Sequence, residues 1–411
     1  MGRKVVFTIA AKNYLGQAKA LGYSIKETNP EVDFHILLAD EIDGHDLQAS
    51  DFTLVEAKTL GIKKFHEMAF KYNVVEYSTS IKPFYLDHLF KNYEYDKILY
   101  LDPDMVVYDN LDYLYEQLDT YDAILTPHII KPYVEYEGAT SEEELLFVGI
   151  YNLGFFGVRR GEVGNTIIQW WKAKLTDQCF ADKADALHVD QRWMDFLPSL
   201  YGSNVGILRH PGVNTAFWNM HEREFTDVDG KYFVDGQPLL VYHFSGLVPE
   251  EYHKLCRKQT KYSLDNKPEY TRLFKEYVDL MNEKCGLQAH KDMHYTYSSY
   301  KNGVYIVPYQ RRLYRGILNQ KSHNFANPFE IGKNSFYELL DNNKLLIIDD
   351  NAKYAKLQKS FPNYKAMFEK ANKGLKVLKK LIGIKRYYMI MRYLGVQSRF
   401  EEQMFLFEKN G

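Results

Sequence analysis

The chain has 411 residues, 45% hydrophobic and 26% charged, a balance that allows a large buried core and excludes a disordered or fibrous protein. Its 52 Lys and Arg against 54 Asp and Glu give a net charge of −2, so no overall positive field favours nucleic acid, and we expect no nucleic-acid partner. The three cysteines are too few and too widely separated for a disulfide framework or a paired-cysteine metal site, which indicates a reducing compartment.

The first third of the chain alternates β-rich runs with segments of helical period, which predicts a parallel sheet with helices on its faces. Apolar residues at three- and four-residue spacing predict a helix over 15–25, which Asn29-Pro30 closes. Further helices are expected over 81–90, 163–175 and 189–197. Strands are expected at 5–9, 34–38, 52–55, 97–101, 123–125, 155–158 and 239–242. These elements predict an α/β fold.

After about Gly286 the sequence becomes rich in Tyr, Asn and Lys, and Asn302-Gly303 is a hairpin signal. Residues 370–399 hold nine Lys or Arg and no acid, with Leu375, Leu378 and Ile382 on one helical face. Such a helix either lies on anionic lipid or docks on its own protein with a solvated basic face. We predict a main domain over 1–285 and a mostly helical extension over 286–411, for contact with an acceptor, a partner or a membrane surface.

The chain opens on a strand-like run at 5–10 with no long apolar region behind it, unlike a secretory signal. No stretch approaches the roughly 18 apolar residues of a membrane span. We therefore expect a cytoplasmic protein, at most peripheral at the inner face of the membrane.

The sharpest local feature is Asp102-Pro103-Asp104, which lies between two apolar runs. In extended chain, residues two apart point to the same side, so both carboxylates can reach one hard divalent cation such as Mn²⁺ or Mg²⁺. Asp227-Val228-Asp229 has the same spacing, but the following Gly230 marks it as a hairpin turn. Only the first pair follows a buried strand, where ligands of open α/β sheets gather. An acidic turn that caps the strand is the structural alternative.

The segment Ile9-Ala10-Ala11-Lys12-Asn13-Tyr14 after the first strand resembles the nucleotide-binding opening of glycosyltransferase family 8, retaining enzymes of the GT-A fold. The resemblance covers about residues 4 to 250, and its further motifs occur in the family's order. They are Ile81-Lys82, 100–104, Tyr151-Asn152-Leu153-Gly154, Asp190-Gln191, 214–223 and His243-Phe244-Ser245-Gly246. The resemblance implies a GT-A, Rossmann-like, mixed and mainly parallel sheet in a nucleotide-sugar-dependent catalytic domain over 1–285.

For the metal and the nucleotide, the resemblance implies that Asp102, Asp104 and His243 bind Mn²⁺ or Mg²⁺. It also implies that the base and ribose of the nucleotide are cradled by Ala10, Asn13 and Tyr14. The ring of Tyr14 would stack on uracil. Structural roles are the alternatives, since a lone histidine after a strand or an aromatic at a helix start is often only packed.

For the donor sugar, the resemblance implies that Lys82 approaches the phosphates or the sugar and that Asn152, Gly154 and Gly246 border the donor. Asp190 would hold hydroxyls of the transferred sugar and Gln191 would lie near its anomeric carbon. Helix caps at 190 and 191 and an exposed lysine at 82 are the structural alternatives. Within 214–223, Trp218 is a candidate for stacking on sugar or for the core, and His221 for binding the acceptor.

The resemblance implies a retaining glycosyltransferase that moves a hexose from a UDP-sugar to a glycan, glycolipid or glycoprotein acceptor in bacterial polysaccharide, lipopolysaccharide or surface-glycan synthesis. Because Gln191 is a poor nucleophile, front-face attack is favoured over a covalent intermediate. Two family features differ here, because Ser80 stands where an arginine is expected and no Lys-Pro-Trp follows Gly246. Lys254 or Arg257 are candidates to replace that lysine.

Two alternatives remain open at this point. One is a catalytically decayed carbohydrate-binding or assembly protein on the same fold. The other is a sugar-nucleotidyltransferase, which needs a glycine-rich basic loop after the first strand, whereas this chain has Ala10-Ala11-Lys12-Asn13 there. The donor sugar, the linkage and the oligomeric state are not specified by the sequence.

Overall fold

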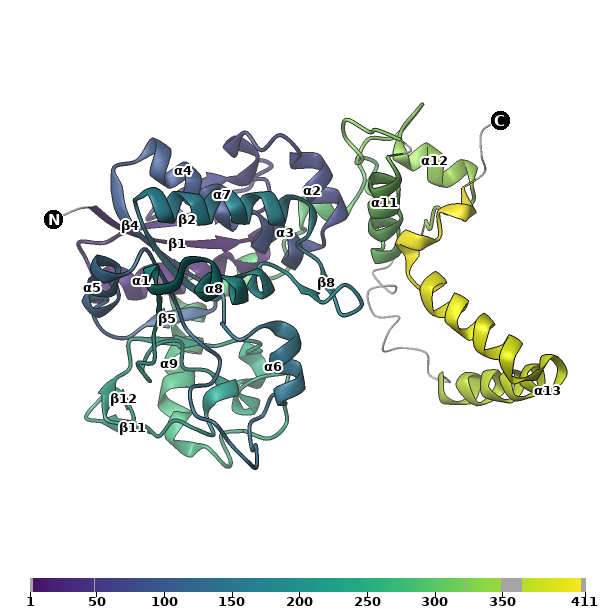
Figure 1. The fold of residues 1–411 in the computed structure, drawn as a ribbon. Helices are drawn as coiled ribbons and strands as arrows, with labels where there is room; N and C mark the ends of the chain where they lie inside the picture. The colour runs from purple at the N-terminus through teal and green to yellow at the C-terminus, as the bar shows by residue number, and fades with distance from the viewer. Residues whose placement is uncertain (1–2, 48, 322, 349–363, 408–411) are drawn as a thin grey trace. The chain divides into compact units, whose positions relative to one another are not determined.

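The computed structural model describes residues 3–47, 49–321, 323–348 and 364–407 (Figure 1). Its contacts divide the chain into two compact units. The first unit comprises Met1–Lys63 and Val74–Tyr295, and the second comprises Lys64–Asn73 and Thr296–Gly411.

The first unit is built on a seven-stranded sheet of order β10-β6-β7-β4-β1-β2-β3. Its strands are β1 (Arg3–Ala10), β2 (Asp33–Leu38), β3 (Thr53–Glu56), β4 (Tyr95–Leu101), β6 (Ala123–Leu125), β7 (Phe155–Arg159) and β10 (Val205–Ile207). Strand β7 pairs antiparallel with both β4 and β6, and the other neighbours pair parallel. The sequence prediction of a mixed, mainly parallel α/β sheet is therefore confirmed.

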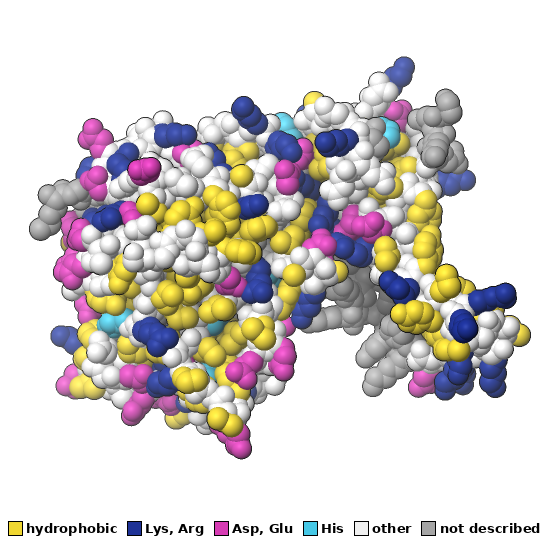
Figure 2. Space-filling view, in the orientation of Figure 1, with side chains coloured by type: hydrophobic (Ala, Val, Ile, Leu, Met, Phe, Trp, Pro, Cys, Tyr) yellow, Lys and Arg dark blue, Asp and Glu magenta, His cyan; other side chains and the backbone are white. Residues whose placement is uncertain are grey.

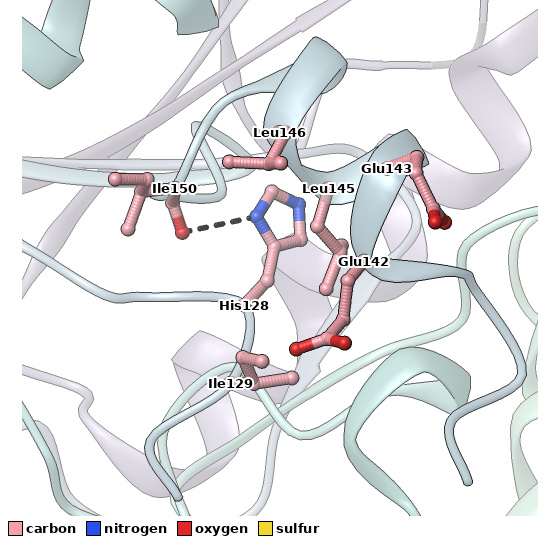
Figure 3. A pocket seen from close by; sticks show the side chains of 7 residues that line it. All are labelled: His128, Ile129, Glu142, Glu143, Leu145, Leu146 and Ile150. Atoms are coloured by element: carbon pink, nitrogen blue, oxygen red, sulfur yellow. Dashed lines mark hydrogen bonds between the residues drawn. The ribbon is translucent and has the colours of Figure 1, made fainter. Parts of the chain in front are cut away.

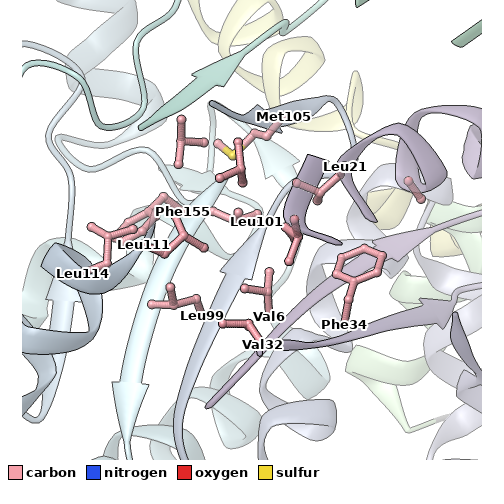
Figure 4. Packing of buried hydrophobic residues seen from close by; sticks show 14 of the residues in the cluster. Val6, Leu21, Val32, Phe34, Leu99, Leu101, Met105, Leu111, Leu114 and Phe155 are labelled. Atoms are coloured by element: carbon pink, nitrogen blue, oxygen red, sulfur yellow. The ribbon is translucent and has the colours of Figure 1, made fainter. Parts of the chain in front are cut away.

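Helices cover both faces of this sheet (Figure 1). They include α1 (Leu15–Thr28), α3 (Val74–Ser80), α4 (Lys82–Asn92), α5 (Asp112–Thr120) and α7 (Glu162–Asp177), whereas α9 (Thr271–Glu283) and α10 (Leu287–His290) pack against α1. Side chains alternate across each strand, so Phe7 contacts Tyr85 of α4 while its neighbour Val6 joins the core beneath α1 and α5. Figure 4 shows that core, in which Leu99 and Leu101 of β4 pack with apolar side chains of the neighbouring elements.

Outside the large sheet lie several short elements. Strand β5 (Met105–Val107) pairs with β14 (Val241–His243), and β8 (Ala181–Asp182) pairs with β9 (Leu187–His188). A three-stranded sheet consists of β13 (Gln237–Pro238) and the hairpin of β11 (Phe225–Val228) and β12 (Lys231–Val234). Helix α6 (Glu142–Val148) also lies outside the large sheet. Asp229 (φ 49°) and Gly230 (φ 85°) form the turn of that hairpin, as the sequence predicts. The helix expected over 189–197 begins later, as the 3₁₀ turn η3 (Gln191–Phe196) followed by α8 (Leu197–Tyr201), because Val189 has a left-handed φ of 41°.

The second unit contains the helices α2 (Phe65–Lys71), α11 (Pro308–Gln320), α12 (Phe336–Asn342) and α13 (Tyr364–Gln397). The buried guanidinium of Arg311 donates to the carbonyls of Phe70, Tyr72 and Tyr297, which joins segment 64–73 to this unit. Gly303 (φ 82°) forms the expected turn, beside one antiparallel bridge between Ser299 and Tyr305. Among the described residues, none of the helices combines the length and apolar character needed to cross a membrane.

Candidate active site

The site begins where β4 ends, because Asp102 follows Leu101 directly and β5 starts at Met105. Strand β14 pairs with β5 so that His243 stands opposite Met105, and the amide of Phe244 donates to the carbonyl of Asp104 at 2.8 Å. This short two-stranded pairing brings a histidine from far along the chain next to the acidic pair.

The three side chains converge on one point. His243 Nε2 lies 3.0 Å from Asp104 Oδ1 and 3.8 Å from Asp102 Oδ2, and one ligand atom from each residue lies within 4.8 Å of the others. The imidazole is buried, whereas both carboxylates keep a partly exposed edge. Burial acts to raise the pKa of Asp104, but the neighbouring His243 and Lys258 outweigh it and hold that pKa below its ordinary value. The surroundings of Asp104 therefore favour its charged carboxylate form.

A chain of buried amides fixes the orientation of the His243 ring. Asn152 Oδ1 accepts from the amide of Gly154 at 3.1 Å, so the group that faces it at 3.0 Å must be the amide nitrogen of Asn214. Asn214 Nδ2 also donates to Thr126 Oγ1, which leaves Asn214 Oδ1 to accept from His243 Nδ1 at 3.3 Å. The proton of a neutral His243 therefore sits on Nδ1, and the lone pair of Nε2 faces the two acids.

The same chain ends at a second histidine. His128 Nδ1 lies 3.1 Å from the carbonyl of Ile150, which only accepts, so this nitrogen donates (Figure 3). Burial lowers the pKa of His128 to about 4, so its ring is neutral and its Nε2 accepts from Asn152 Nδ2 at 3.2 Å. Backbone groups at 150 and 154 thus set the direction of every hydrogen bond up to His243.

These residues suit a divalent cation in their donor chemistry. An imidazole lone pair 3.0 Å from a carboxylate oxygen is repulsive without a shared proton or cation between them. Two carboxylates and one imidazole nitrogen form a donor set that Mn²⁺ accepts. Asp102 is also oriented, because Tyr100 donates its hydroxyl to Asp102 Oδ1 at 2.5 Å. The cluster therefore meets the requirements of a metal site.

Gly154 is required by a close approach. A Cβ at this position would lie 2.6 Å from Cε1 of His243 and 2.8 Å from both Asn152 Oδ1 and Met105 Cε. Those distances are far below ordinary contact, so any side chain at 154 would displace the imidazole or the amide. Gly246, in the turn after His243, has φ 75°, a left-handed conformation that favours glycine.

A buried ion pair forms part of the cavity wall. Lys82 Nζ is 2.5 Å from Asp190 Oδ2, and the two side chains are 1% and 3% exposed. The ammonium also donates to the carbonyl of Leu153 at 2.7 Å and lies 3.9 Å from the centroid of the Tyr100 ring. Burial raises the pKa of Asp190 above its ordinary value in spite of the opposing charge of Lys82. Lys82 is therefore a partner of Asp190 rather than an exposed helix lysine.

The amide of Gln191 is engaged at both ends. Its Oε1 accepts from the amide of Leu153 at 3.0 Å, and its Nε2 donates to the carbonyl of Val148 at 2.8 Å. Gln191 therefore holds the backbone of Leu153, the residue before Gly154, and also lines the cavity.

The expected nucleotide-binding residues lie at the end of β1. Ala10 is the last residue of the strand, and Asn13 and Tyr14 belong to the following 3₁₀ turn η1 (Lys12–Tyr14). The neighbouring Lys12 is buried and pairs with Asp40 at 3.4 Å, which ties this turn to the end of β2. Tyr14 is 40% exposed, and partial burial together with the charge of Asp104 raises its pKa above the ordinary value.

A cavity of about 640 Å³ opens beside the cluster. Seven of the residues expected from the sequence line it, namely Lys82, Asp102, Asn152, Gly154, Asp190, Gln191 and His243. Ala10, Asn13, Tyr14, Asp104 and Gly246 lie outside this lining. Trp218 also forms part of the wall, with its ring edge-on to His243, and its indole nitrogen has no hydrogen-bond partner among the described residues.

Lys258 is a cavity residue that sequence reasoning missed. Its ammonium donates to Ser245 Oγ at 3.0 Å, and its charge reaches Asp104. Of the two candidates named above, Lys254 instead pairs with Glu251 on the surface, and the charge of Arg257 acts on Tyr14. The position expected to carry an arginine holds Ser80, which is buried and donates to the carbonyl of Tyr77.

A second cavity of about 430 Å³ adjoins the first, and the two share His128 and Leu145 (Figure 3). Helix α6 forms one wall with Leu146 and the acidic side chains of Glu142 and Glu143. The histidine of the amide chain therefore separates two adjoining hollows of the first unit.

Comparison with known proteins relates the first part of this chain to one enzyme family. Residues 5–154 match glycosyl transferase family 8. The uncharacterized protein YfnF of Bacillus subtilis (strain 168) is 29% identical over 246 residues, which cover 58% of this chain and 80% of that protein. YfnD of the same organism is 26% identical over 187 residues, which cover 44% of this chain and 57% of that protein.

Among solved structures, the galactosyltransferase LgtC in complex with donor and acceptor sugar analogs is similar at 17% identity and a TM-score of 0.43, over 68% of this chain and 95% of LgtC. The glycosyltransferase GlyE of Streptococcus pneumoniae TIGR4 is similar at 17% identity and a TM-score of 0.39, over 73% of this chain and 67% of GlyE. The family match runs from β1 through the acidic pair to Gly154. Residues 5–154 of this chain are therefore similar to glycosyl transferase family 8.

Proposed function

We propose that the protein is a retaining glycosyltransferase that transfers a hexose from a UDP-sugar, with Mn²⁺ or Mg²⁺ held by Asp102, Asp104 and His243. The observation that carries this proposal is the convergence of those side chains at a cavity, with the lone pair of His243 Nε2 turned toward the acids. When bound there, the cation would supply the positive charge that stabilises the departing diphosphate.

Lys258 is our candidate for a further diphosphate ligand. Its flexible ammonium lies on the cavity wall and, among the residues that the structure describes, donates to the hydroxyl of Ser245, so it can turn toward a phosphate oxygen. In this role it replaces the lysine that the family carries in Lys-Pro-Trp. Tyr14, Asn13 and Ala10 would receive the uracil and the ribose, since they follow β1 at the carboxyl edge of the sheet.

The transferred sugar would lie over Asp190, between Lys82 and the segment Asn152–Gly154, with Gly246 at the border of the donor. Retention then favours attack from the front face, in which a diphosphate oxygen accepts the acceptor proton as the sugar–phosphate bond breaks. Two hydrogen bonds engage the amide of Gln191, and Asp190 is paired with Lys82, so neither side chain is placed as a free nucleophile.

We further propose a glycan, glycolipid or glycoprotein acceptor and a role in bacterial polysaccharide, lipopolysaccharide or surface-glycan synthesis in the cytoplasm. The second cavity, next to His128, is open for the acceptor, because its apolar walls and two carboxylates suit a sugar with one apolar face.

Hydrolysis of nucleotide sugars tests this proposal without knowledge of the acceptor. A panel of UDP-hexoses would be incubated with the full chain and Mn²⁺, and released UDP would be measured with and without a chelator. We expect release from at least one UDP-hexose that stops when the metal is removed. Release that persists with chelator would refute the metal-dependent scheme, and no release from any donor would favour the decayed carbohydrate-binding alternative.

A further inference from the structure

The basic segment 370–399 forms a helix that is interrupted once. Helix α13 spans Tyr364–Gln397, and Gly383 (φ 76°, ψ 162°) breaks it into two segments. Over 370–399 the sequence places nine Lys or Arg and no acidic residue. The segment is therefore a concentrated positive charge within a chain whose net charge is only −2.

The apolar side chains of this helix are exposed or half-buried within the second unit. No side chain over 369–397 is buried, and the exposed fraction reaches 78% at Leu381 and 70% at Met389. Helix α9 shows the opposite, because its apolar residues Leu273, Phe274 and Tyr277 are buried. Within the second unit, therefore, packing buries none of the described side chains of this helix.

The first segment of α13 separates charge from apolar surface. Lys373, Lys376 and Lys380 recur at three- and four-residue spacing, and so do Leu375, Leu378 and Ile382. At 3.6 residues per turn these two sets lie on different sides of the helix. Figure 2 shows hydrophobic and basic side chains next to one another over α13. Phe400, Phe405 and Leu406, which follow the helix in the chain, are also exposed.

We propose that residues 370–399 bind the surface of an anionic lipid bilayer. A bilayer offers negative headgroups to the lysines and an apolar layer to the leucines and tyrosines, which is how basic amphipathic helices lie in an interface. A second copy of the same segment is disfavoured as the occupant, because it would set nine positive charges against nine others. This contact goes beyond the sugar chemistry and does not depend on it.

The test measures co-sedimentation of the full chain with vesicles of phosphatidylcholine alone and with vesicles that also contain phosphatidylglycerol. We expect binding to the anionic vesicles that weakens as salt is added. The triple variant Lys376→Gln, Lys379→Gln and Lys380→Gln should lower the partition coefficient about a hundredfold, at about fivefold per lysine. The double variant Leu378→Ser and Leu381→Ser should also lower it, because the apolar face is then polar.

A matched control removes the same charge elsewhere. Lys91, Lys254 and Lys275 are exposed on the first unit, and their change to Gln should leave vesicle binding unchanged. Equal binding of both vesicle types, or equal loss in the control, would overturn the proposal. Self-association that the leucine variant abolishes, without any vesicle binding, would overturn it in favour of a second copy. Hydrolysis of UDP-sugars without vesicles is measured on the same variants, so a failure of the sugar chemistry is separately visible.

Discussion

The buried pair of Lys82 and Asp190 gives a prediction whose size follows from the structure. Lys82→Met removes an ammonium that lies 2.5 Å from a carboxylate which is only 3% exposed. Removing one partner of such a pair costs about 3–5 kcal/mol because the other charge is left buried. At roughly 2 °C per kcal/mol, the low end for large domains, the melting temperature should fall by about 6–10 °C near neutral pH.

The loss should depend on pH with a defined sign. The pKa of Asp190 is already raised by burial, and removal of Lys82 raises it further. A carboxyl with a raised folded-state pKa contributes stability below its unfolded pKa, and this stability is lost as pH rises through the folded pKa. The destabilisation of Lys82→Met should therefore be small near pH about 4 and grow toward pH about 8.

Differential scanning calorimetry across this range provides the measurement. The double variant Lys82→Met with Asp190→Asn should lose most of this added pH dependence, because no charge remains at either position of the pair. Lys91→Met is the matched control, since Lys91 lies on the same helix but is 66% exposed and pairs with Asp87 at the surface. It should change stability by at most about 1 kcal/mol. A pH-independent loss in Lys82→Met would refute the buried-charge reasoning.

Three further predictions concern the site. Asn214→Ala should weaken Mn²⁺ binding about 10- to 100-fold, measured by calorimetric titration, because the proton on His243 Nδ1 loses its acceptor; unchanged affinity would contradict the amide chain. Gly154→Ala should also weaken Mn²⁺ binding, because its methyl group occupies the place of the His243 ring, and unaltered affinity would show that the ring is free to move. Lys258→Met should weaken UDP binding about 10- to 100-fold in a competition assay, the loss of one charge-assisted hydrogen bond, whereas Lys254→Met should not.

Local chemistry predicts much of the fold. The predicted apolar positions Leu15, Ala18, Gly22 and Ile25 are all buried in α1, and the helix ends before Asn29-Pro30 as expected. The antiparallel direction of β7 and the pairing of β5 with β14 depend instead on contacts between distant segments. No periodicity within either segment carries that information, so the arrangement was accessible only through the family resemblance.

The site was predictable to a similar, limited extent. The spacing and placement of Asp102 and Asp104 indicate a cation site, while His243 came from the resemblance alone. Asn214 begins the motif 214–223, but its contact with His243 was not predicted, and Lys258 carried no usable signal, because the importance of both arises from which distant groups they face. Asn214 has a left-handed φ of 56°, a conformation that a single asparagine in a sequence does not predict.

Titration of Mn²⁺ into the full chain in the presence of UDP tests the central claim most directly. The comparison uses Asp104→Asn and, as a control with the same Asp-x-Asp spacing, Asp229→Asn in the β11–β12 turn. We predict that the wild type and Asp229→Asn bind Mn²⁺ with equal affinity and that Asp104→Asn loses most of it. Wild-type affinity in Asp104→Asn, with the fold intact, would contradict the assignment of Asp102, Asp104 and His243 as the metal site.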